Sequence, residues 1–360
     1  FWIDAGWYEG GWPNGVGNFF ADPKRFPNGL GPVGKAAAEN GYKFLLWIEP
    51  ERVHVGTQMY AEHPKWVLKN DRYYSTSSNG LLNLGNDAAR KWLTDKISEI
   101  LETGGISIYR QDFNMDPLMY WLAADKPDRR GMTEIRYVEG LYKFWDELLQ
   151  RHPGLMIDNC ASGGRRLDLE TISRSVALWR TDYAEGADGS DSSLPSGYQA
   201  QTYALSLWLP THSTGSSTLD RYTFRSAMTN GIVMSWNPLK PGLPMETVDS
   251  LAAEFKRARD FYYGDFYPLT PYSTDIDTWL AYQFQRDDLG GGMVLAFRRE
   301  QAPDSSIVVR LRGLSPDARY ELDYSGKNIK KTVSGKELMR GLKITLSHPH
   351  ESELIFYKRK

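Results

Sequence analysis

The sequence has 360 residues, of which 41% are hydrophobic and 24% charged, and its formal net charge is -2 at pH 7. This length fits one large domain plus a small one, and the composition is ordinary for a soluble globular protein. A charge so close to zero provides no long-range field for nucleic acid or an anionic membrane. The longest apolar runs are strand-sized, so we expect no nucleic-acid partner and no membrane span.

The single cysteine, Cys160, excludes an internal disulfide framework. This suits a reducing cytoplasm but is equally compatible with a secreted bacterial protein, so the localisation stays open between the two. Residues 1–8 have the pattern of a buried strand already under way, with no charged-then-apolar leader before it. We therefore expect the chain to be a piece of a longer protein that lacks its true N-terminus. The pattern carries no information on oligomeric state.

In residues 1–264, short apolar runs alternate with stretches of helical period, which indicates βα units and a parallel sheet. The predicted strands are 1–8, 42–51, 81–85, 106–115, 155–164, 176–183, 202–212 and 231–237. The predicted helices are 31–40, 87–103, 133–151, 166–173, 218–230 and 246–262, with a poorly defined turn near Tyr198. Eight such units close most simply into a (β/α)₈ TIM barrel. A doubly wound sheet is the alternative, but no glycine-rich phosphate motif follows the first strand.

After about Tyr263 the pattern changes to an alternation of period two, punctuated by turns such as Leu289-Gly290-Gly291-Gly292. The predicted strands are 278–285, 293–300, 306–314, 319–324, 341–348 and 353–358. The sequence therefore predicts that residues 265–360 form a small antiparallel β-sandwich domain that contributes no catalytic residue.

Polar residues end many of the predicted barrel strands, where a TIM barrel builds its active site. They are Asp4, Glu49, Glu51, Arg110, Asp112, Asn114, Asp158, Asn159, Cys160, Arg180, Asp182, His212, Trp236 and Asn237. Carboxylates inside apolar strands are costly unless they are paired or functional, and two acids facing each other across a barrel mouth suit glycosidic bond cleavage. No His or Cys cluster has metal-ligand spacing and no nucleophile elbow is present, so we expect no metal and no cofactor.

Several motifs resemble those of glycoside hydrolase family 36, the α-galactosidases. Residues 109–114, Tyr-Arg-Gln-Asp-Phe-Asn, resemble the family's Lys-Trp-Asp-Met-Asn, and residues 160–168, Cys-Ala-Ser-Gly-Gly-Arg-Arg-Leu-Asp, resemble its Cys-Ser-Gly-Gly-Gly-Gly-Arg-Phe-Asp. Residues 179–182, Trp-Arg-Thr-Asp, are similar to Trp-Thr-Ser-Asp, and residues 47–51, Trp-Ile-Glu-Pro-Glu, to Trp-Phe-Glu-Pro-Glu. Residues 26–30, Phe-Pro-Asn-Gly-Leu, match the family's Phe-Pro-Xaa-Gly-Leu.

This resemblance implies a retaining glycoside hydrolase that cleaves terminal α-linked, galactose-configured sugars from an oligosaccharide or glycoconjugate by double displacement. Asp112 would be the nucleophile and Asp182 the general acid/base, with carboxyl groups near the retaining separation of about 5 to 5.5 Å. The residues expected to bind the sugar are Asp4, Trp47, Arg110, Asn114, Cys160 and Arg180. Trp47 and Cys160 could equally be core residues, and Asp112 could be an acid paired with Arg110. We expect Arg166 and Asp168 to form a structural ion pair.

The chain departs from the family motifs at several positions. The paired aspartates of the family's Leu-Asp-Asp-Gly-Trp are here Asp4-Ala5, the motif lysine is Arg110, the tryptophan before the nucleophile is Gln111, and one motif glycine is Arg165. Ala5 and Gln111 suggest a reshaped pocket, so an α-galactosaminidase or α-N-acetylgalactosaminidase is the first alternative. A non-catalytic carbohydrate-binding pseudo-enzyme is the second, although both carboxylates are retained.

Overall fold

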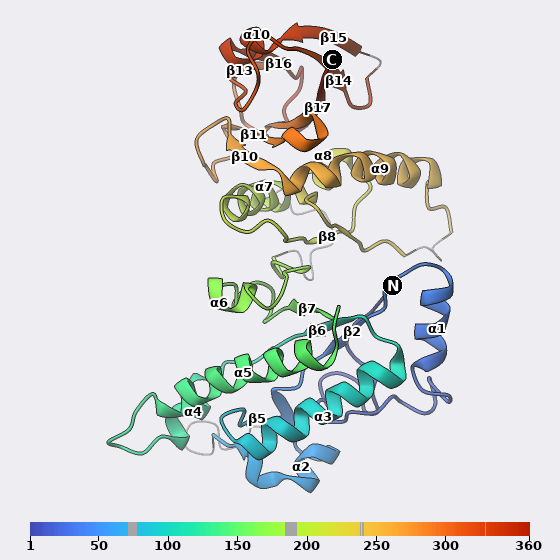
Figure 1. Cartoon of the computed structure of the whole chain (residues 1–360), viewed down its shortest axis with the longest axis vertical. Helices are drawn as coiled ribbons and strands as arrows, with labels where there is room; N and C mark the ends of the chain where they lie inside the picture. Colours follow the sequence, from blue (N-terminus) through green and yellow to red (C-terminus); the bar gives the residue numbers. More distant parts are fainter. Residues whose placement is uncertain (71–77, 184–192, 238, 240, 328) are drawn as a thin grey trace. The chain divides into compact units, whose positions relative to one another are not determined.

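The computed structural model describes residues 1–70, 78–183, 193–237, 239, 241–327 and 329–360 (Figure 1). The chain forms two compact units, Phe1–Ala177 and Leu178–Lys360. We refer to them as the N-terminal unit and the C-terminal unit and describe each by itself. None of the helices in the described ranges combines the length and apolar character that crossing a membrane requires.

A four-stranded parallel sheet forms the centre of the N-terminal unit, in the order β1-β2-β6-β7. Its strands are β1 (Trp2–Ile3), β2 (Leu45–Ile48), β6 (Ile108–Gln111) and β7 (Met156–Asn159). All four residues of β2 are buried, as expected for a parallel strand covered on both faces. Val176 extends the pattern through an isolated parallel bridge to Asp158. The first, second, fourth and fifth predicted barrel strands are therefore confirmed with shorter bounds.

The helices of this unit follow the strands in sequence. They are α1 (Gly31–Glu39), α2 (Gln58–Glu62), η1 (Pro64–Trp66), α3 (Asp87–Gly104), α4 (Leu118–Ala124), α5 (Met132–Arg151) and α6 (Leu169–Ile172). The long helix α3 begins where Asn86 accepts hydrogen bonds from two backbone N–H groups, and ends at Gly105 in the left-handed conformation. Helices α3 and α5 lie side by side (Figure 1).

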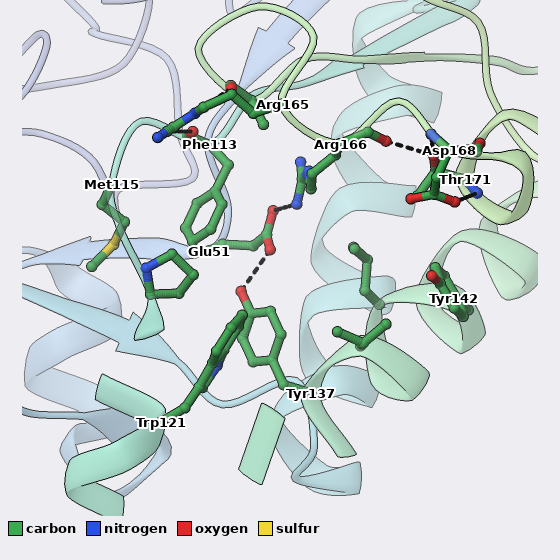
Figure 2. A pocket seen from close by; sticks show the side chains of 14 residues that line it. Glu51, Phe113, Met115, Trp121, Tyr137, Tyr142, Arg165, Arg166, Asp168 and Thr171 are labelled. Atoms are coloured by element: carbon green, nitrogen blue, oxygen red, sulfur yellow. Dashed lines mark hydrogen bonds and ion pairs between the residues drawn. The ribbon is translucent and has the colours of Figure 1, made fainter. Parts of the chain in front are cut away.

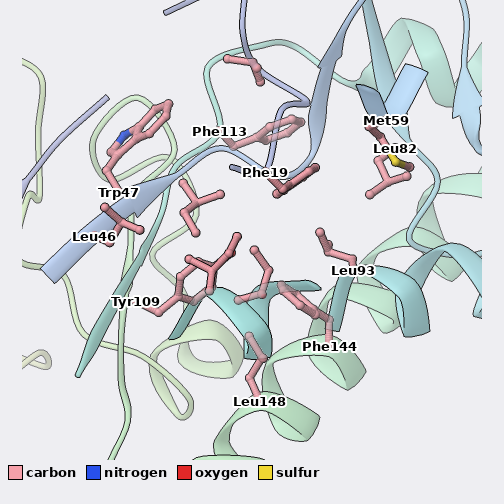
Figure 3. Close-up of a cluster of buried hydrophobic side chains, with 14 of the residues drawn as sticks. Phe19, Leu46, Trp47, Met59, Leu82, Leu93, Tyr109, Phe113, Phe144 and Leu148 are labelled. Carbon is pink, nitrogen blue, oxygen red and sulfur yellow. The ribbon is translucent and has the colours of Figure 1, made fainter. Parts of the chain in front are cut away.

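Figure 3 shows the hydrophobic core of the N-terminal unit, in which strand and helix side chains meet. Leu46 and Tyr109 from the sheet share this core with Leu93 of α3 and with Phe144 and Leu148 of α5. The core fixes the parallel strands against their helices, so the residues at the carboxyl ends of the strands have a rigid base.

The predicted third barrel strand, 81–85, is wrong. Strand β5 (Asn79–Leu82) pairs antiparallel with β3 (Arg52–His54) and β4 (Val67–Leu68) in a separate three-stranded sheet. Strand β2 instead pairs directly with β6, from Leu45 with Ile108 to Ile48 with Gln111. A short apolar run predicts a strand but does not predict the partner of that strand.

Among the described residues, the C-terminal unit begins with three helices and two short strands. They are α7 (Ser193–Ser206), α8 (Arg221–Ala227), α9 (Met245–Ala258), β8 (Gly215–Ser216) and β9 (Val233–Met234), followed by η2 (Arg259–Tyr263). Strands β8 and β9 pair in parallel. The predicted strand 202–212 is wrong, because its first residues belong to α7. Buried residues at 198, 199, 202 and 203 follow the spacing of a helix face.

The antiparallel β-domain is confirmed. Six strands are arranged in the order β10-β11-β12-β17-β14-β15, and β13 pairs with β16. Their bounds are β10 (Asp265–Pro268), β11 (Trp279–Arg286), β12 (Gly291–Arg298), β13 (Ser306–Val309), β14 (Arg319–Tyr324), β15 (Ile329–Ser334), β16 (Leu342–Thr345) and β17 (Glu351–Arg359), with η3 (Asp287–Leu289) and α10 (Gly335–Arg340) between strands. One sheet face packs on β13, β16 and α10, and the other contributes to a core with α8 and α9.

Candidate active site

Asp112 follows directly after β6, at the carboxyl end of the parallel sheet, and its carboxylate is buried with each oxygen held by two donors. The backbone N–H groups of Phe113 and Ser162 donate to Oδ1 over 2.7 and 3.2 Å. The indole of Trp47 and the side-chain amide of Asn114 donate to Oδ2 over 3.0 and 2.9 Å. These four contacts fix the plane of the carboxylate.

The environment keeps Asp112 ionised. Burial by itself raises the pKa of this carboxyl, but the Arg110 charge and the hydrogen bonds from Asn114, Trp47 and the Phe113 N–H outweigh burial and hold the pKa below its ordinary value. A carboxylate that is buried and still charged has the electronic state that a nucleophile requires.

Arg110 is buried and pairs with acids other than Asp112. Its Nη1 lies 2.6 Å from Asp158 Oδ2, and its Nε lies 3.6 Å from Asp4 Oδ2. Burial opposes the charge on Arg110, but Asp158 and the neighbouring acidic groups keep its pKa above the ordinary value. The alternative that Asp112 is a structural acid paired with Arg110 therefore does not describe the observed ion pairs.

Asp4 lies next to this arginine with more than half of its side chain exposed. Its Oδ2 accepts a hydrogen bond from the Trp2 indole over 2.8 Å, and its Oδ1 accepts one from the Ala5 backbone N–H. The ring of Trp2 also stacks on Arg110, whose guanidinium carbon lies 4.8 Å from the ring centroid. Asp4, Trp2 and Arg110 thus form one group at the end of β1.

Trp47, Asn114 and Cys160, which were predicted to contact the sugar, lie around Asp112. Trp47 is only 2% exposed, and Asn114 holds both Asp112 and the Ser162 hydroxyl, whose oxygen lies 2.9 Å from Asn114 Oδ1. Cys160 is buried, and burial raises the pKa of its thiol. The structure therefore brings these three residues together with Asp112, while direct contact with a sugar stays a prediction.

Glu49 and Glu51, which the sequence predicts at strand ends, accept hydrogen bonds from residues close to Asp112 in the sequence. Glu49 accepts the backbone N–H of Asn114 over 2.6 Å and pairs with Arg52 over 2.6 Å. Burial raises the pKa of Glu49, partly offset by Arg52 and the Asn114 N–H. Glu51 accepts hydrogen bonds from Gln111, Tyr137 and Arg166.

Gln111 does not reshape a pocket, contrary to the expectation from the motif comparison. It is fully buried in the N-terminal unit, with its amide on Glu51 and its carbonyl oxygen accepting from Tyr109 and Trp145. Adjacent residues of a strand point to opposite faces, so Arg110 and Asp112 share one face and Gln111 belongs to the other. This alternation was the signal in the sequence that could have placed Gln111 correctly.

The expected ion pair between Arg166 and Asp168 is also wrong. Arg166 lies 2.6 Å from Glu51, whereas Asp168 caps α6 by accepting the backbone N–H groups of Glu170 and Thr171. A Ser/Thr/Asp residue just before a helix commonly takes this role.

A pocket in the N-terminal unit, shown in Figure 2, has a volume of about 280 Å³. Phe113, Met115, Trp121 and Tyr137 form much of its apolar wall, and the Glu51 carboxylate lies at the wall with Arg166 and Tyr137 bound to it. None of the residues predicted to bind or cleave the sugar lines this pocket, so it is distinct from the group around Asp112.

The remaining predicted residues belong to the C-terminal unit. Asp182 accepts a hydrogen bond from the Trp179 indole over 2.9 Å. Arg180 is buried and donates to His212 Nδ1, the Tyr198 carbonyl and the Thr202 hydroxyl. Burial lowers the pKa of Arg180 to about 10 and, together with the arginine charge, lowers that of His212 well below its ordinary value. Because Asp112 and Asp182 lie in different units, their separation stays a prediction.

Within the described ranges, no three His, Cys, Asp or Glu residues form a group that could hold a metal ion. The expectation that the reaction needs no metal and no cofactor stays a prediction.

Comparison with solved structures defines the class of the fold. The GH36 α-galactosidase AgaB of Geobacillus stearothermophilus superimposes with a TM-score of 0.85 at 24% identity, covering 100% of this chain and 50% of that chain. A variant of the GH36 α-galactosidase AgaA of the same organism, in complex with raffinose, gives a TM-score of 0.83 at 23% identity, covering 100% and 51%. The fold is therefore the predicted TIM barrel followed by an antiparallel β-domain.

Comparison of sequences gives the family. Residues 1–255 match the Melibiase family, and residues 279–356 match the glycosyl hydrolase family 36 C-terminal domain. The chain belongs to the Melibiase family. α-Galactosidase C of Emericella nidulans is 28% identical over 393 residues, covering 100% of this chain and 49% of that protein. The chain thus spans about half the length of the curated relatives it matches.

Proposed function

We propose that this chain is the catalytic part of a retaining α-galactosidase, with residues 1–264 as the barrel and 265–360 as the β-domain. The observation that carries the proposal is the buried, ionised carboxylate of Asp112, held by two donors on each oxygen at the carboxyl end of a parallel strand. Membership of the Melibiase family and the similarity to α-galactosidase C of Emericella nidulans support the same substrate class.

In the proposed mechanism, one oxygen of Asp112 attacks the anomeric carbon while Asp182 donates a proton to the leaving glycosidic oxygen. The C–O bond to the leaving group breaks as the bond to Asp112 forms. Asp182 then removes a proton from water, which displaces Asp112 and restores the original anomeric configuration. The two backbone amides on Oδ1 anchor that oxygen, which leaves Oδ2, bound only by side-chain donors, as the attacking atom.

Arg110 and Asp4 are the proposed contacts to the sugar hydroxyls, because the charge of Arg110 acts on Asp112 and Asp4, which is substantially exposed, lies beside Arg110. Trp47, Asn114 and Cys160 hold or border the nucleophile. Arg180 is assigned to the same site through its position two residues before Asp182. The proposed substrate is a terminal α-galactoside of an oligosaccharide or glycoconjugate, without a cofactor.

The experiment is a panel of aryl α-glycosides of galactose, galactosamine, N-acetylgalactosamine and glucose, assayed with purified full-length protein. Proton NMR of the first-formed sugar distinguishes retention from inversion. We expect α-galactose to be released first as the α-anomer. Release of the β-anomer would contradict the double displacement, and inactivity on all substrates would favour the pseudo-enzyme.

A second candidate, an enzyme for a 2-amino or 2-acetamido galactoside, is favoured by one observation. The position next to Asp4 carries a methyl side chain, and the backbone N–H of Ala5 is used by Asp4 itself. The residue therefore offers no carboxylate to a sugar hydroxyl. A higher kcat/KM for the galactosamine or N-acetylgalactosamine substrate in the same panel would select this candidate.

A further inference from the structure

Ser162 has an unusual backbone conformation beside the nucleophile. Its φ is +49°, in the left-handed region that residues other than glycine rarely adopt. In this conformation the Ser162 N–H points to Asp112 Oδ1 over 3.2 Å. The backbone of a residue with a side chain is strained in this region, and the strain persists only where surrounding contacts hold the backbone in place.

Arg165 supplies such contacts from within the same loop. Its Nε donates to the Ala161 carbonyl over 2.9 Å, and its Nη2 donates to the Ser162 hydroxyl over 3.0 Å. Arg165 thus contacts both Ser162, whose backbone is strained, and Ala161, the residue before it. The isolated bridge between Ala161 and Gly164 closes the loop between them.

The same guanidinium reaches across to the segment that carries the nucleophile. Its Nη2 lies 3.4 Å from the Phe113 carbonyl oxygen, and its Nη1 donates to Asp116 over 2.8 Å. Arg165 therefore connects the loop after β7 with the segment after β6, and Asp112 lies between the two.

The Ser162 hydroxyl extends this connection to the second oxygen of Asp112. It donates to Asn114 Oδ1, which orients the Asn114 amide so that Nδ2 donates to Asp112 Oδ2 over 2.9 Å. One residue thus contacts the nucleophile directly through its N–H and indirectly through Asn114.

The family motif quoted above has glycine at both positions, where this chain has Ser162 and Arg165. Glycine adopts the left-handed conformation without strain, so a loop with glycine at 162 needs no clamp. The two departures are therefore coupled: the serine adds a hydroxyl for Asn114 and introduces strain, and the arginine holds the strained peptide.

We propose that Arg165 is a positioning residue that clamps the Ser162 peptide onto Oδ1 of Asp112, so that the other oxygen is aimed at the anomeric carbon. The proposal rests on the proposed function for its catalytic consequence, but its structural consequence at Ser162 is independent of any activity.

The first test compares Arg165→Ala with Arg174→Ala in the full-length protein. Arg174 is the matched control, because it is also an ion-paired arginine of the N-terminal unit, but its partners are Asp146 and Glu170. We expect Arg165→Ala to lower kcat about tenfold with KM changed less than about twofold, since a misaimed nucleophile affects chemistry more than binding. The acidic limb of kcat/KM should move to higher pH as Asp112 loses a donor. Arg174→Ala should change neither quantity.

The second test combines Ser162→Gly with Arg165→Ala. Glycine at position 162 adopts the left-handed conformation without strain, so no clamp is needed there. We expect the double variant to recover most of the lost kcat, and Arg165→Lys to recover part of it. A double variant no more active than Arg165→Ala would overturn the coupling of the two positions.

Crystal structures of wild type and Arg165→Ala provide the readout that does not depend on catalysis. We expect Ser162 in the variant to leave the left-handed region, with loss of the N–H contact to Asp112. A variant that keeps both would overturn the clamp. If wild type hydrolyses no glycoside while Ser162 shifts as expected, the proposed function fails and the clamp stands.

Discussion

The side-chain amide of Gln111 donates to the carboxylate of Glu51 over 2.8 Å in the interior of the N-terminal unit, where neither side chain reaches solvent. Tyr137 and Arg166 bind the same carboxylate, so the charge of Glu51 is balanced and its oxygens are hydrogen-bonded. Gln111, the residue next to Asp112 in the sequence, thus belongs to the packed interior of this unit.

Gln111→Leu tests this assignment. The change removes a donor from Glu51 and leaves Tyr109 and Trp145 without their acceptor, so we expect a loss of about 2 to 4 kcal/mol in the free energy of unfolding. Urea denaturation measures this loss. The exposed Gln58→Leu serves as control and should change stability by less than about 0.5 kcal/mol. A Gln111→Leu variant with unchanged stability but an altered KM would indicate instead that Gln111 shapes the substrate pocket.

Asp112→Ala should lower kcat for an aryl α-galactoside at least about 10³-fold, because the proposed mechanism forms the glycosyl-enzyme on this carboxylate. Azide, a small anion that fits the deleted carboxylate, should restore turnover and yield the β-galactosyl azide, identified by NMR. The exposed Asp146→Ala should keep wild-type activity. If azide accelerated the Asp182→Ala variant but left Asp112→Ala inactive, Asp182 would be the nucleophile and Asp112 the acid/base.

Trp47→Phe removes one donor from Asp112 Oδ2 and keeps most of the ring. The hydrogen bond stabilises the ionised form, so its loss raises the pKa of Asp112 from its present low value. Since the proposed nucleophile must be ionised to react, the acidic limb of the pH–activity profile should move to higher pH by about one pH unit. The pH profile of kcat/KM gives this shift. An unmoved acidic limb would show that the indole N–H does not control ionisation.

Ala5→Asp restores the second carboxylate of the family motif at an exposed position beside Asp4. One charge-assisted hydrogen bond contributes about 1.5 to 3 kcal/mol, so KM for an aryl α-galactoside should fall by about one to two decades. Steady-state kinetics measure the change, with Ala5→Asn as the uncharged control. No gain, or a loss, would indicate a pocket built for another sugar.

The Arg225–Glu254 ion pair in the C-terminal unit predicts a pH-dependent stability. The pair is buried at 2.7 Å, and although burial raises the pKa of Glu254, Arg225 and Ser325 hold it below its ordinary value. A carboxyl with a lowered folded pKa stabilises the protein above its unfolded pKa and loses this contribution as pH falls through the folded value. Glu254→Gln should therefore cost about 3 to 5 kcal/mol at neutral pH. The difference from wild type should shrink in acid; a constant difference would contradict the linkage.

Much of the fold follows from the sequence because period and end signals agree. Asn86 before α3 and Gly105 after it mark both ends of a helix whose apolar residues recur at helical spacing. The strand predicted over 202–212 fails because Thr202 and Tyr203 are good strand formers that α7 buries through tertiary packing. Strands β10 and β15 were missed, since an exposed edge strand such as β15 has little apolar alternation to detect.

Part of the candidate site could likewise be predicted from the sequence, and part could not. The motif around Asp112 predicts the nucleophile, because its residue types and strand-end position are local properties of the sequence. The partner of Arg110 is not local: Arg110 lies opposite Asp158 in the register of β6 and β7, 48 residues apart in the chain. The left-handed backbone of Ser162 was equally out of reach, because serine gives no sign of a conformation that glycine usually marks.

The position of β17 constrains how the C-terminal unit is made. It lies between β12 and β14 at the middle of the six-stranded sheet, yet it follows both of them in the sequence. On the ribosome, β12 and β14 emerge before the strand that joins them, which also carries Leu354 and Phe356 into the core with α8 and α9. The two halves of this sheet therefore cannot be joined until β17 has been synthesised.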